Sequence, residues 1–319
     1  MNESIAALTD LLAAGDVTVL SGAGMSTDSG IPDYRGPDGA LQRHTPMSYR
    51  EFLSGPQARR RYWARSHAGW RRVAQARPNA AHSAVAALEH GGQVSGVITQ
   101  NVDGLHQRAG SRDVIELHGS LAAVVCLSCG QRRSRREMAA RLEDANPDFG
   151  LSFPVASAGV AAAPDGDADL PDALVDGFTV VGCRGCGDGI LKPEVVFFGE
   201  SVPRERVERC FEMVERSRAL LVVGSSLTVM SGYRFVIRAR DRGIPVAIVN
   251  RGPSRGEGDA CVRIDAGVCD VLPRVVQHST HDAPSASMAA TRSRVATKAS
   301  GLTEIESMPA RTRNAASSG

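Results

Sequence analysis

The sequence lacks a long apolar run, a basic N-terminal segment and an excess of charge of either sign. No stretch of its 319 residues reaches the ~18 uninterrupted apolar positions that a membrane span needs. The N-terminal segment contains Glu3 and Asp10 instead of a basic region, which predicts an amphipathic helix over residues 4–14 rather than a signal peptide. The formal net charge is only +2, so the composition provides no overall attraction for nucleic acid. We therefore expect a cytoplasmic protein that binds no membrane and no specific nucleic acid.

Cysteine is scarce and odd in number, with seven residues, so a disulfide framework is not indicated. Four of the cysteines form two Cys-x-x-Cys pairs, each followed by glycine: Cys126, Cys129, Cys183 and Cys186. Four thiolates give closed tetrahedral coordination, so the pairs predict one structural Zn²⁺. A redox pair and free thiols are the alternatives. Neither pair lies at the strand–helix junction of a thioredoxin-like unit, which favours zinc.

Apolar strands alternate with helices along the chain. Strand-like segments occupy residues 17–22, 94–101, 113–120, 189–200, 219–226 and 244–252. Helical patterns lie between them, at residues 4–14, 79–90, 135–142, 206–217 and 233–243, and Asn79 is expected to cap the second of these helices. This alternation is typical of α/β folds. We predict a Rossmann-like doubly wound parallel sheet with a smaller inserted structural-zinc domain.

Changes in composition divide the chain into six segments. Residues from 279 onward lack a usable apolar period, which predicts disorder. We expect a Rossmann-like domain in three parts, separated by two insertions and followed by a tail: 1–36 (first part), 37–80 (loop and helical insertion), 81–120 (second part), 121–190 (zinc-binding small domain), 191–278 (third part) and 279–319 (disordered tail).

The segment GAGMSTDSGIPDYRG, residues 22–36, begins like a dinucleotide-binding turn. After a buried strand, Gly22, Ala23 and Gly24 would let backbone N–H groups approach a pyrophosphate; a tight strand-to-helix turn is the alternative. Thr27 takes the place of a third glycine, and no second strand ends in an acid about 20 residues later. An ordinary dehydrogenase is therefore disfavoured. The loop that follows suits a reaction that breaks the nicotinamide bond.

Polar residues follow the other predicted strands, where parallel sheets bind ligands. Gln100, Asn101 and Asp103 follow one strand, 224–226 and 250–252 follow two more, and His118 follows a fourth. Ser225 or Ser226 could instead cap the next helix. Taken together, the strand ends favour a ligand. A neutral His118 at this edge could act as general base for a hydroxyl.

These segments resemble the sirtuin family of NAD-dependent protein deacylases. The resemblance is carried, in order from residue 4 to 277, by GAGMSTDSGIPDYRG, TQNVDGLH, ELHG, the two Cys-x-x-Cys pairs, LKPEVVFFGE, VGSSLTVMSG and IVNRGP. The segments IPDYR, RRYWAR, APDGD and SGYRF are most similar to the class II branch, which includes the mitochondrial sirtuin known for lipoamidase and ADP-ribosyltransferase activities. The resemblance implies NAD⁺ and one structural Zn²⁺ as cofactors.

The resemblance also implies a role for each matching position. The catalytic residues would be His118, Asn101 and Asp103. The NAD contacts would be Gly22, Ala23, Gly24, Thr27, Asp33, Tyr34, Arg35, Gln100, Asn101, Asp103, Gly224, Ser225, Ser226, Asn250, Arg251, Gly252, Val268 and Cys269. An extended acyl-lysine peptide would pair with the edge formed by Val195, Val196, Phe197, Phe198 and Gly199.

The implied activity is NAD-dependent removal of acyl groups from protein lysines, with release of nicotinamide and O-acyl-ADP-ribose. Because no Tyr-x-x-Arg pair is clearly placed to bind the carboxylate of a succinyl or malonyl group, we expect neutral acyl groups. Protein mono-ADP-ribosyl transfer or lipoamide cleavage at the same NAD site is the alternative. A zinc-ribbon module binding nucleic acid through CGQRRSRRE is disfavoured, because it would leave the strand-end residues without a role.

Overall fold

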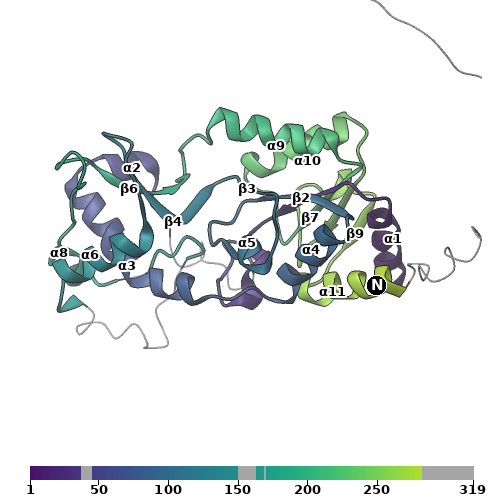
Figure 1. Ribbon diagram of the computed structural model, residues 1–319, viewed down its shortest axis with the longest axis horizontal. Helices are drawn as coiled ribbons and strands as arrows, with labels where there is room; N and C mark the ends of the chain where they lie inside the picture. Colours follow the sequence, from purple (N-terminus) through teal and green to yellow (C-terminus); the bar gives the residue numbers. More distant parts are fainter. Residues whose placement is uncertain (37–44, 150–162, 169, 282–319) are drawn as a thin grey trace, which may run out of the picture. The chain divides into compact units, whose positions relative to one another are not determined.

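A parallel sheet forms the larger part of the protein. The computed structural model describes residues 1–36, 45–149, 163–168 and 170–281. Within these ranges, six strands pair in the order β3-β2-β1-β7-β8-β9, and every pair is parallel (Figure 1). The strands are β1 (Val17–Ser21), β2 (Val94–Thr99), β3 (Val114–Glu116), β7 (Ala219–Val223), β8 (Val246–Val249) and β9 (Val262–Ile264). The predicted doubly wound fold is confirmed; β9 was not predicted.

Helices cover both faces of this sheet, as the apolar strands require. Successive strand residues point to opposite faces. Val19 accordingly packs in a core with α1 (Asn2–Ala13), α4 (Ala80–His90) and α11 (Val268–His281). Its neighbour Leu20 packs in a second core with α9 (Arg204–Arg216) and α10 (Met230–Asp241). Cys210, on α9, is fully buried in this second core.

The strand order places a topological switch point between β1 and β7. Chain connections run outward from this point in both directions, and ligands of open α/β sheets bind in the crevice that results. Gly22 directly follows β1, and Gly224 directly follows β7. Both glycine segments singled out in the sequence therefore lie at the edge where a ligand is expected.

A second sheet is antiparallel and smaller. It contains β4 (Gly119–Cys126), β5 (Arg132–Ser134) and β6 (Leu191–Val195), in the order β5-β4-β6. It shares a hydrophobic core with α2 (Tyr49–Leu53), α3 (Pro56–Gln75), α6 (Arg135–Ala145) and α8 (Asp172–Asp176). The sequence placed residues from 191 onward in the larger domain, but β6 pairs with β4, so that boundary is wrong for β6.

Asn79 caps α4, as predicted. Its Oδ1 accepts hydrogen bonds from the backbone N–H groups of Ala81 (3.0 Å) and His82 (3.1 Å). Its Nδ2 donates to the carbonyl of Met25 at 2.8 Å, which ties the start of α4 to the glycine turn. That turn continues as two 3₁₀ turns, η1 (Ala23–Met25) and η2 (Thr27–Ser29), instead of a regular helix.

The C-terminal helix α11 extends into the segment predicted as tail. It ends at His281, so residues 279–281 are helical. The rest of the predicted tail, 282–319, lies outside the described residues, as do residues 150–162 and 169 before α8. Among the helices that the structure describes, none combines the length and apolar character needed to cross a membrane.

Candidate active site

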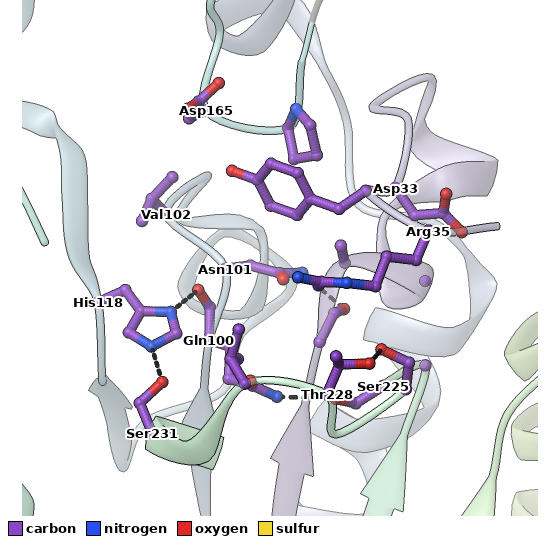
Figure 2. A pocket seen from close by; sticks show the side chains of 18 of the residues that line it. Asp33, Arg35, Gln100, Asn101, Val102, His118, Asp165, Ser225, Thr228 and Ser231 are labelled. Carbon is purple, nitrogen blue, oxygen red and sulfur yellow. Dashed lines mark hydrogen bonds between the residues drawn. The ribbon is translucent and has the colours of Figure 1, made fainter. Parts of the chain in front are cut away.

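A cavity of about 1050 Å³ lies at the switch point. Residues from the large sheet and from the small sheet both line it (Figure 2). The structure brings together in this cavity most of the predicted site residues: Gly22, Ala23, Gly24, Asp33, Tyr34, Arg35, Gln100, Asn101, Asp103, His118, Val195, Val196, Phe197, Phe198, Gly199, Gly224, Ser225, Ser226, Asn250, Arg251 and Gly252.

Three residues assigned to NAD do not line the cavity. Thr27 is exposed, and its hydroxyl donates to the carbonyl of Gly24 at 3.2 Å. Val268 is buried in the core beneath α1 and α4, with Cys269 packed against the same core. At the start of α11 these two side chains serve packing, and a contact from their backbone N–H groups to adenine stays a prediction.

The glycines of the two strand-end turns pack against each other. The N–H of Gly24 donates to the carbonyl of Gly224 at 2.9 Å. A Cβ at Gly22 would lie 2.8 Å from that same carbonyl oxygen, and Gly224 has a φ of +59°. Side chains at these positions would separate the turns after β1 and β7. The glycines thus allow the backbones of the two turns to approach closely. They also leave the adjoining part of the cavity free of side chains, so a ligand can contact the backbone.

An amide and a carboxylate are held rigidly beside the glycine turn. Asn101 Nδ2 donates to the carbonyl of Gly22 (3.0 Å) and to Ser26 Oγ (3.1 Å). Ser26 in turn donates to Asp103 Oδ2 at 2.7 Å, and the N–H of Leu105 donates to Oδ1 at 2.9 Å. Burial raises the pKa of Asp103, although these two hydrogen bonds oppose the shift. Ser26 was not predicted; its position two residues after Gly24 was the available signal.

The hydrogen bonds of His118 define its tautomer. Its Nδ1 lies 2.9 Å from the backbone carbonyl oxygen of Gln100, which can only accept, so Nδ1 carries the proton. Nε2 of the neutral ring is therefore an acceptor, and it lies 2.9 Å from Ser231 Oγ (Figure 2). Gln100 Nε2 donates to Ser225 Oγ at 2.9 Å, which links the ends of β2 and β7. The Gln100 carbonyl and the Ser231 hydroxyl thus orient the His118 ring from two sides. Ser231 was not predicted as a site residue.

The surroundings keep His118 neutral. Burial lowers the pKa of its imidazole, and the positive charges of Arg206 on α9 and Arg234 on α10 lower it further. The hydrogen bond to the Gln100 carbonyl favours the cation and opposes this shift. A neutral imidazole with an acceptor nitrogen is the form that a general base needs.

His118 occupies the junction between the two sheets. It follows β3 and precedes β4, and the next residue, Gly119, has a φ of +81°. A Cβ at Gly119 would lie 2.0 Å from the carbonyl oxygen of Glu194, so no other residue fits at this position. The carbonyl of His118 accepts a hydrogen bond from the N–H of Val196 at 2.8 Å.

Residues 195–199 form a partly paired strand edge. The carbonyl of Phe198 accepts from the N–H of Tyr49 at 2.9 Å, on the side facing α2. Phe198 also forms a parallel bridge with Ser48, so its N–H and its carbonyl both face the segment that leads into α2, whereas the carbonyl of Val196 makes no backbone hydrogen bond with the residues that the structure describes. The Val196 carbonyl is thus left available for pairing with an extended peptide. The Tyr34 ring contacts the Phe198 ring at 5.7 Å.

A Tyr-x-x-Arg spacing does occur, at Tyr62 and Arg65, and of these two residues Tyr62 lines the cavity. Tyr62 and Arg65 lie three residues apart on one face of α3. Tyr62 lines the cavity, and burial raises the pKa of its hydroxyl. Arg65 Nε lies 2.9 Å from Asp167 Oδ1 in an ion pair that is mostly buried. Asp165 and Asp167, which also line the cavity, were not predicted.

The four paired cysteines meet at the end of the small sheet. Their sulfur atoms all lie within 4.8 Å of one another, and the pairs Cys126–Cys186 and Cys129–Cys183 are each 3.7 Å apart. A tetrahedron with Zn–S bonds of ~2.3 Å has sulfur–sulfur edges of about 3.8 Å. A Cβ at Gly189 would lie 2.3 Å from Cys126 Sγ, so glycine is required beside the cluster. The donor set and spacing fit one structural Zn²⁺.

The cavity also fits a dinucleotide. Its volume is at the upper end of the ~300–1,000 Å³ typical of ligand pockets. The Arg35 side chain extends into it (Figure 2), and no ion pair joins this guanidinium to the part of the chain that the structure describes. A cation and a glycine turn at a switch point suit a pyrophosphate. The fold and the site therefore define an α/β dinucleotide-binding protein with a four-cysteine metal site.

Comparison with known proteins gives the family. A family model described as the Sir2 family matches residues 22–231. NAD-dependent protein deacetylase 1 of Streptomyces coelicolor is 61% identical over 260 residues, which cover 82% of this chain and 85% of that protein. NAD-dependent protein deacetylase 1 of Mycobacterium avium is 52% identical over 83% of this chain and 92% of that protein. The chain belongs to the Sir2 family.

Solved structures agree with this assignment. One, described as "Structural Basis for the Mechanism and Regulation of Sir2 Enzymes", is 32% identical with a TM-score of 0.69, over 88% of this chain and 99% of that one. Another, described as "Sir2-p53 peptide-NAD+", is 29% identical with a TM-score of 0.66, over 86% of this chain and 98% of that one. In that protein, the same fold holds both NAD⁺ and a peptide.

Proposed function

We propose that this chain is an NAD-dependent protein deacetylase that removes acyl groups from lysine side chains. The acyl group would be transferred to ADP-ribose, giving nicotinamide and O-acyl-ADP-ribose. One observation carries the proposal: a neutral His118, the Asn101–Asp103 cluster and the partly paired strand edge at residues 195–199 converge on one cavity. The names of the Streptomyces coelicolor and Mycobacterium avium relatives support it. A cytoplasmic location is part of the proposal.

The proposal assigns a task to each group of residues. The glycine turns and Arg35 would hold the pyrophosphate, and the segments after β7 and β8 the adenosine half. Bound NAD⁺ would supply a sugar carbon from which nicotinamide leaves. Asn101 and Asp103, fixed by Ser26, would position the nicotinamide end beneath the loop at 33–35. His118 Nε2 would then receive a proton from a sugar hydroxyl, and the Gln100 carbonyl would stabilise the resulting imidazolium.

Neutral acyl groups are the proposed substrates. A Tyr-x-x-Arg pair could bind an acyl group that ends in a carboxylate, but Arg65 is already paired with Asp167. Asp165 and Asp167 line the same cavity, so a second carboxylate there would face like charges. Acetyl and longer uncharged chains avoid this repulsion.

A second candidate uses the same NAD site with a different acceptor. The segments IPDYR, RRYWAR and SGYRF, which are most similar to the class II branch, favour lipoamide cleavage or protein mono-ADP-ribosyl transfer. The bacterial relatives named above are called deacetylases, which favours the first candidate. Assignment to the class II branch is therefore part of the second candidate.

Product mass separates the candidates. The purified protein would be incubated with NAD⁺ and with acetyl-, longer-acyl-, succinyl- and lipoyl-lysine peptides, and the products weighed by mass spectrometry. Deacetylation gives O-acetyl-ADP-ribose and a lighter peptide, and succinyl peptides react far more slowly. A protein heavier by one ADP-ribose, with unchanged peptides, would establish the second candidate. Absence of nicotinamide release with every peptide would contradict both.

A buried ion pair supports the proposed peptide edge. Lys192 Nζ lies 2.9 Å from Glu200 Oε2, and only 5% of the lysine side chain is exposed. The same carboxylate oxygen accepts a hydrogen bond from the N–H of Phe197 at 2.8 Å, and Lys192 also donates to the carbonyl of Val195. The ammonium lies 4.7 Å from the centre of the Phe197 ring. Lys192 thus fixes the backbone that would pair with the peptide.

Replacing Lys192 with methionine is expected to loosen this edge. The variant leaves Glu200 partly buried without its partner, which typically costs about 3–5 kcal/mol. We expect a lower Tm and a KM for the peptide raised by about tenfold or more, with little change in the affinity for NAD⁺. Arg132→Met, which removes an exposed ion pair to Glu194 on the same small sheet, is the control and should change little. Wild-type Tm and peptide KM in Lys192→Met would contradict the role.

A further inference from the structure

The hydroxyl of Ser231 is hydrogen-bonded to the acceptor nitrogen of His118, the proposed base. In the described structure both imidazole nitrogens of His118 already have partners: Nδ1 donates to the Gln100 carbonyl, and Nε2 accepts from Ser231. The only nitrogen with a lone pair is thus covered by a serine hydroxyl. A sugar hydroxyl can reach that nitrogen by displacing Ser231, or it can pass its proton through Ser231.

The placement of Ser231 favours passage through the hydroxyl. Ser231 is the second residue of α10, and it lines the cavity together with His118. It contributes no cap to its own helix, since the N-cap of α10 is Val229 and makes no side-chain hydrogen bond. Among the residues that the structure describes, the partner of its hydroxyl is His118 (Figure 2). The hydroxyl is thus directed at the base and exposed to the ligand space at the same time.

We propose that Ser231 is a proton relay between the sugar hydroxyl and His118. This inference rests on the proposed function. Ser231 Oγ accepts the hydroxyl proton of the sugar while its own proton passes to His118 Nε2. The O–H bond of the sugar and the original O–H bond of Ser231 break, and new bonds form from hydrogen to Oγ and to Nε2. Ser231 ends neutral, His118 ends as an imidazolium, and the sugar oxygen carries the negative charge.

The surrounding charges suit this transfer. Arg206 on α9 and Arg234 on α10 are the charged groups that act on the imidazole, and both disfavour a permanent imidazolium. His118 thus stays available as an acceptor, and the Gln100 carbonyl stabilises the cation once it forms. The hydroxyl of a serine can donate and accept in turn, which a relay requires.

The test compares Ser231→Ala and Ser231→Thr with Ser83→Ala, which removes an exposed hydroxyl on α4 outside the cavity. The first readout uses the ligand-free protein. Imidazole ¹⁵N NMR should show the Nδ1–H tautomer of His118 in every variant. Ser231→Ala alone should move the Nε2 resonance toward that of a nitrogen without a hydrogen bond.

The second readout separates two chemical steps. Exchange of labelled nicotinamide into NAD⁺ reports bond cleavage, which needs no base, and O-acetyl-ADP-ribose formation reports the later step. Ser231→Ala should slow product formation by about tenfold or more while exchange stays within about twofold of wild type. Ser231→Thr should restore product formation, and Ser83→Ala should match wild type in both assays.

Two results would overturn the relay. One is wild-type product formation in Ser231→Ala, which would mean that the sugar hydroxyl reaches Nε2 directly. The other is an equal loss of exchange and product formation, which would indicate only a structural role. Failure of the wild-type protein to release nicotinamide with any acyl peptide would instead reject the proposed function, and the NMR comparison would still report the Ser231 hydrogen bond.

Discussion

Replacing His118 with alanine is expected to reduce O-acetyl-ADP-ribose formation by about 10²–10⁴-fold, the loss typical of a missing general base. The Nδ1–H of His118 is hydrogen-bonded to the Gln100 carbonyl, which leaves Nε2 as the nitrogen that can accept a proton. Among the described residues, no other histidine lines the cavity. Mass spectrometry of the products measures the effect. Nicotinamide exchange should persist, because cleavage of the nicotinamide bond requires no base.

His278→Ala is the matched control. His278 also has its Nδ1 against a backbone carbonyl, that of Arg274 at 2.7 Å, but it is exposed on α11 and away from the cavity. This variant should keep wild-type activity. Full product formation by His118→Ala would show that another group takes the proton.

The environment of His118 predicts how kcat/KM depends on pH. Burial first, and then Arg206 and Arg234, lower the pKa of His118 from 6.5. The neutral form is the active form of a base, so a lowered pKa keeps the enzyme active to lower pH. We expect kcat/KM to hold from neutral pH down to about pH 6.5 and to fall only below it. A fall already complete at pH 6.5 would contradict this environment for His118.

Removal of zinc is the second prediction with a large effect. The cluster joins the end of β4, at Cys126, to the segment before β6, at Cys183 and Cys186. Structural zinc contributes about 10–16 kcal/mol to the folding of small domains, so chelation should unfold the small sheet. Residues 195–199 continue from β6, so unfolding of the small sheet would disrupt the proposed peptide edge. Activity should therefore be lost, even though the glycine turns proposed to hold NAD follow strands of the large sheet. Calorimetry, metal content and product formation would be followed together.

Variants make the zinc test specific. Cys183→Ser should lose zinc and activity, whereas Cys261→Ser, at an exposed cysteine next to β9, should keep both. Wild-type Tm and full activity after complete loss of zinc would contradict the structural role.

The features that the sequence predicted are those encoded in short contiguous segments. The glycine turn, the amide-rich strand ends and the Cys-x-x-Cys pairs are local patterns, and all but Thr27 of their assigned residues meet as expected. Asn79 as a helix cap is equally local. Each depends on a residue's neighbours in the chain, which a single sequence displays.

The features that were missed depend on residues far apart in the chain. Ser231 reaches His118, 113 positions away in the chain, because α10 packs in the same hydrophobic core as Leu117, the residue before His118. The β5 strand was missed because Arg132 and Arg133 are exposed and show no apolar pattern. The side chains of Val268 and Cys269 belong to the core at the start of α11, a placement that the sequence alone does not show, and their backbone contact to adenine stays a prediction.

The hydrogen bond from the N–H of Val196 to the carbonyl of His118 joins the proposed peptide edge to the backbone of the proposed base. Under the proposed function, a peptide that displaces this edge would also displace the backbone of His118, and a poorly matched substrate would then lose turnover as well as affinity. Discrimination between protein targets should accordingly appear in kcat, even among sequences that bind equally tightly.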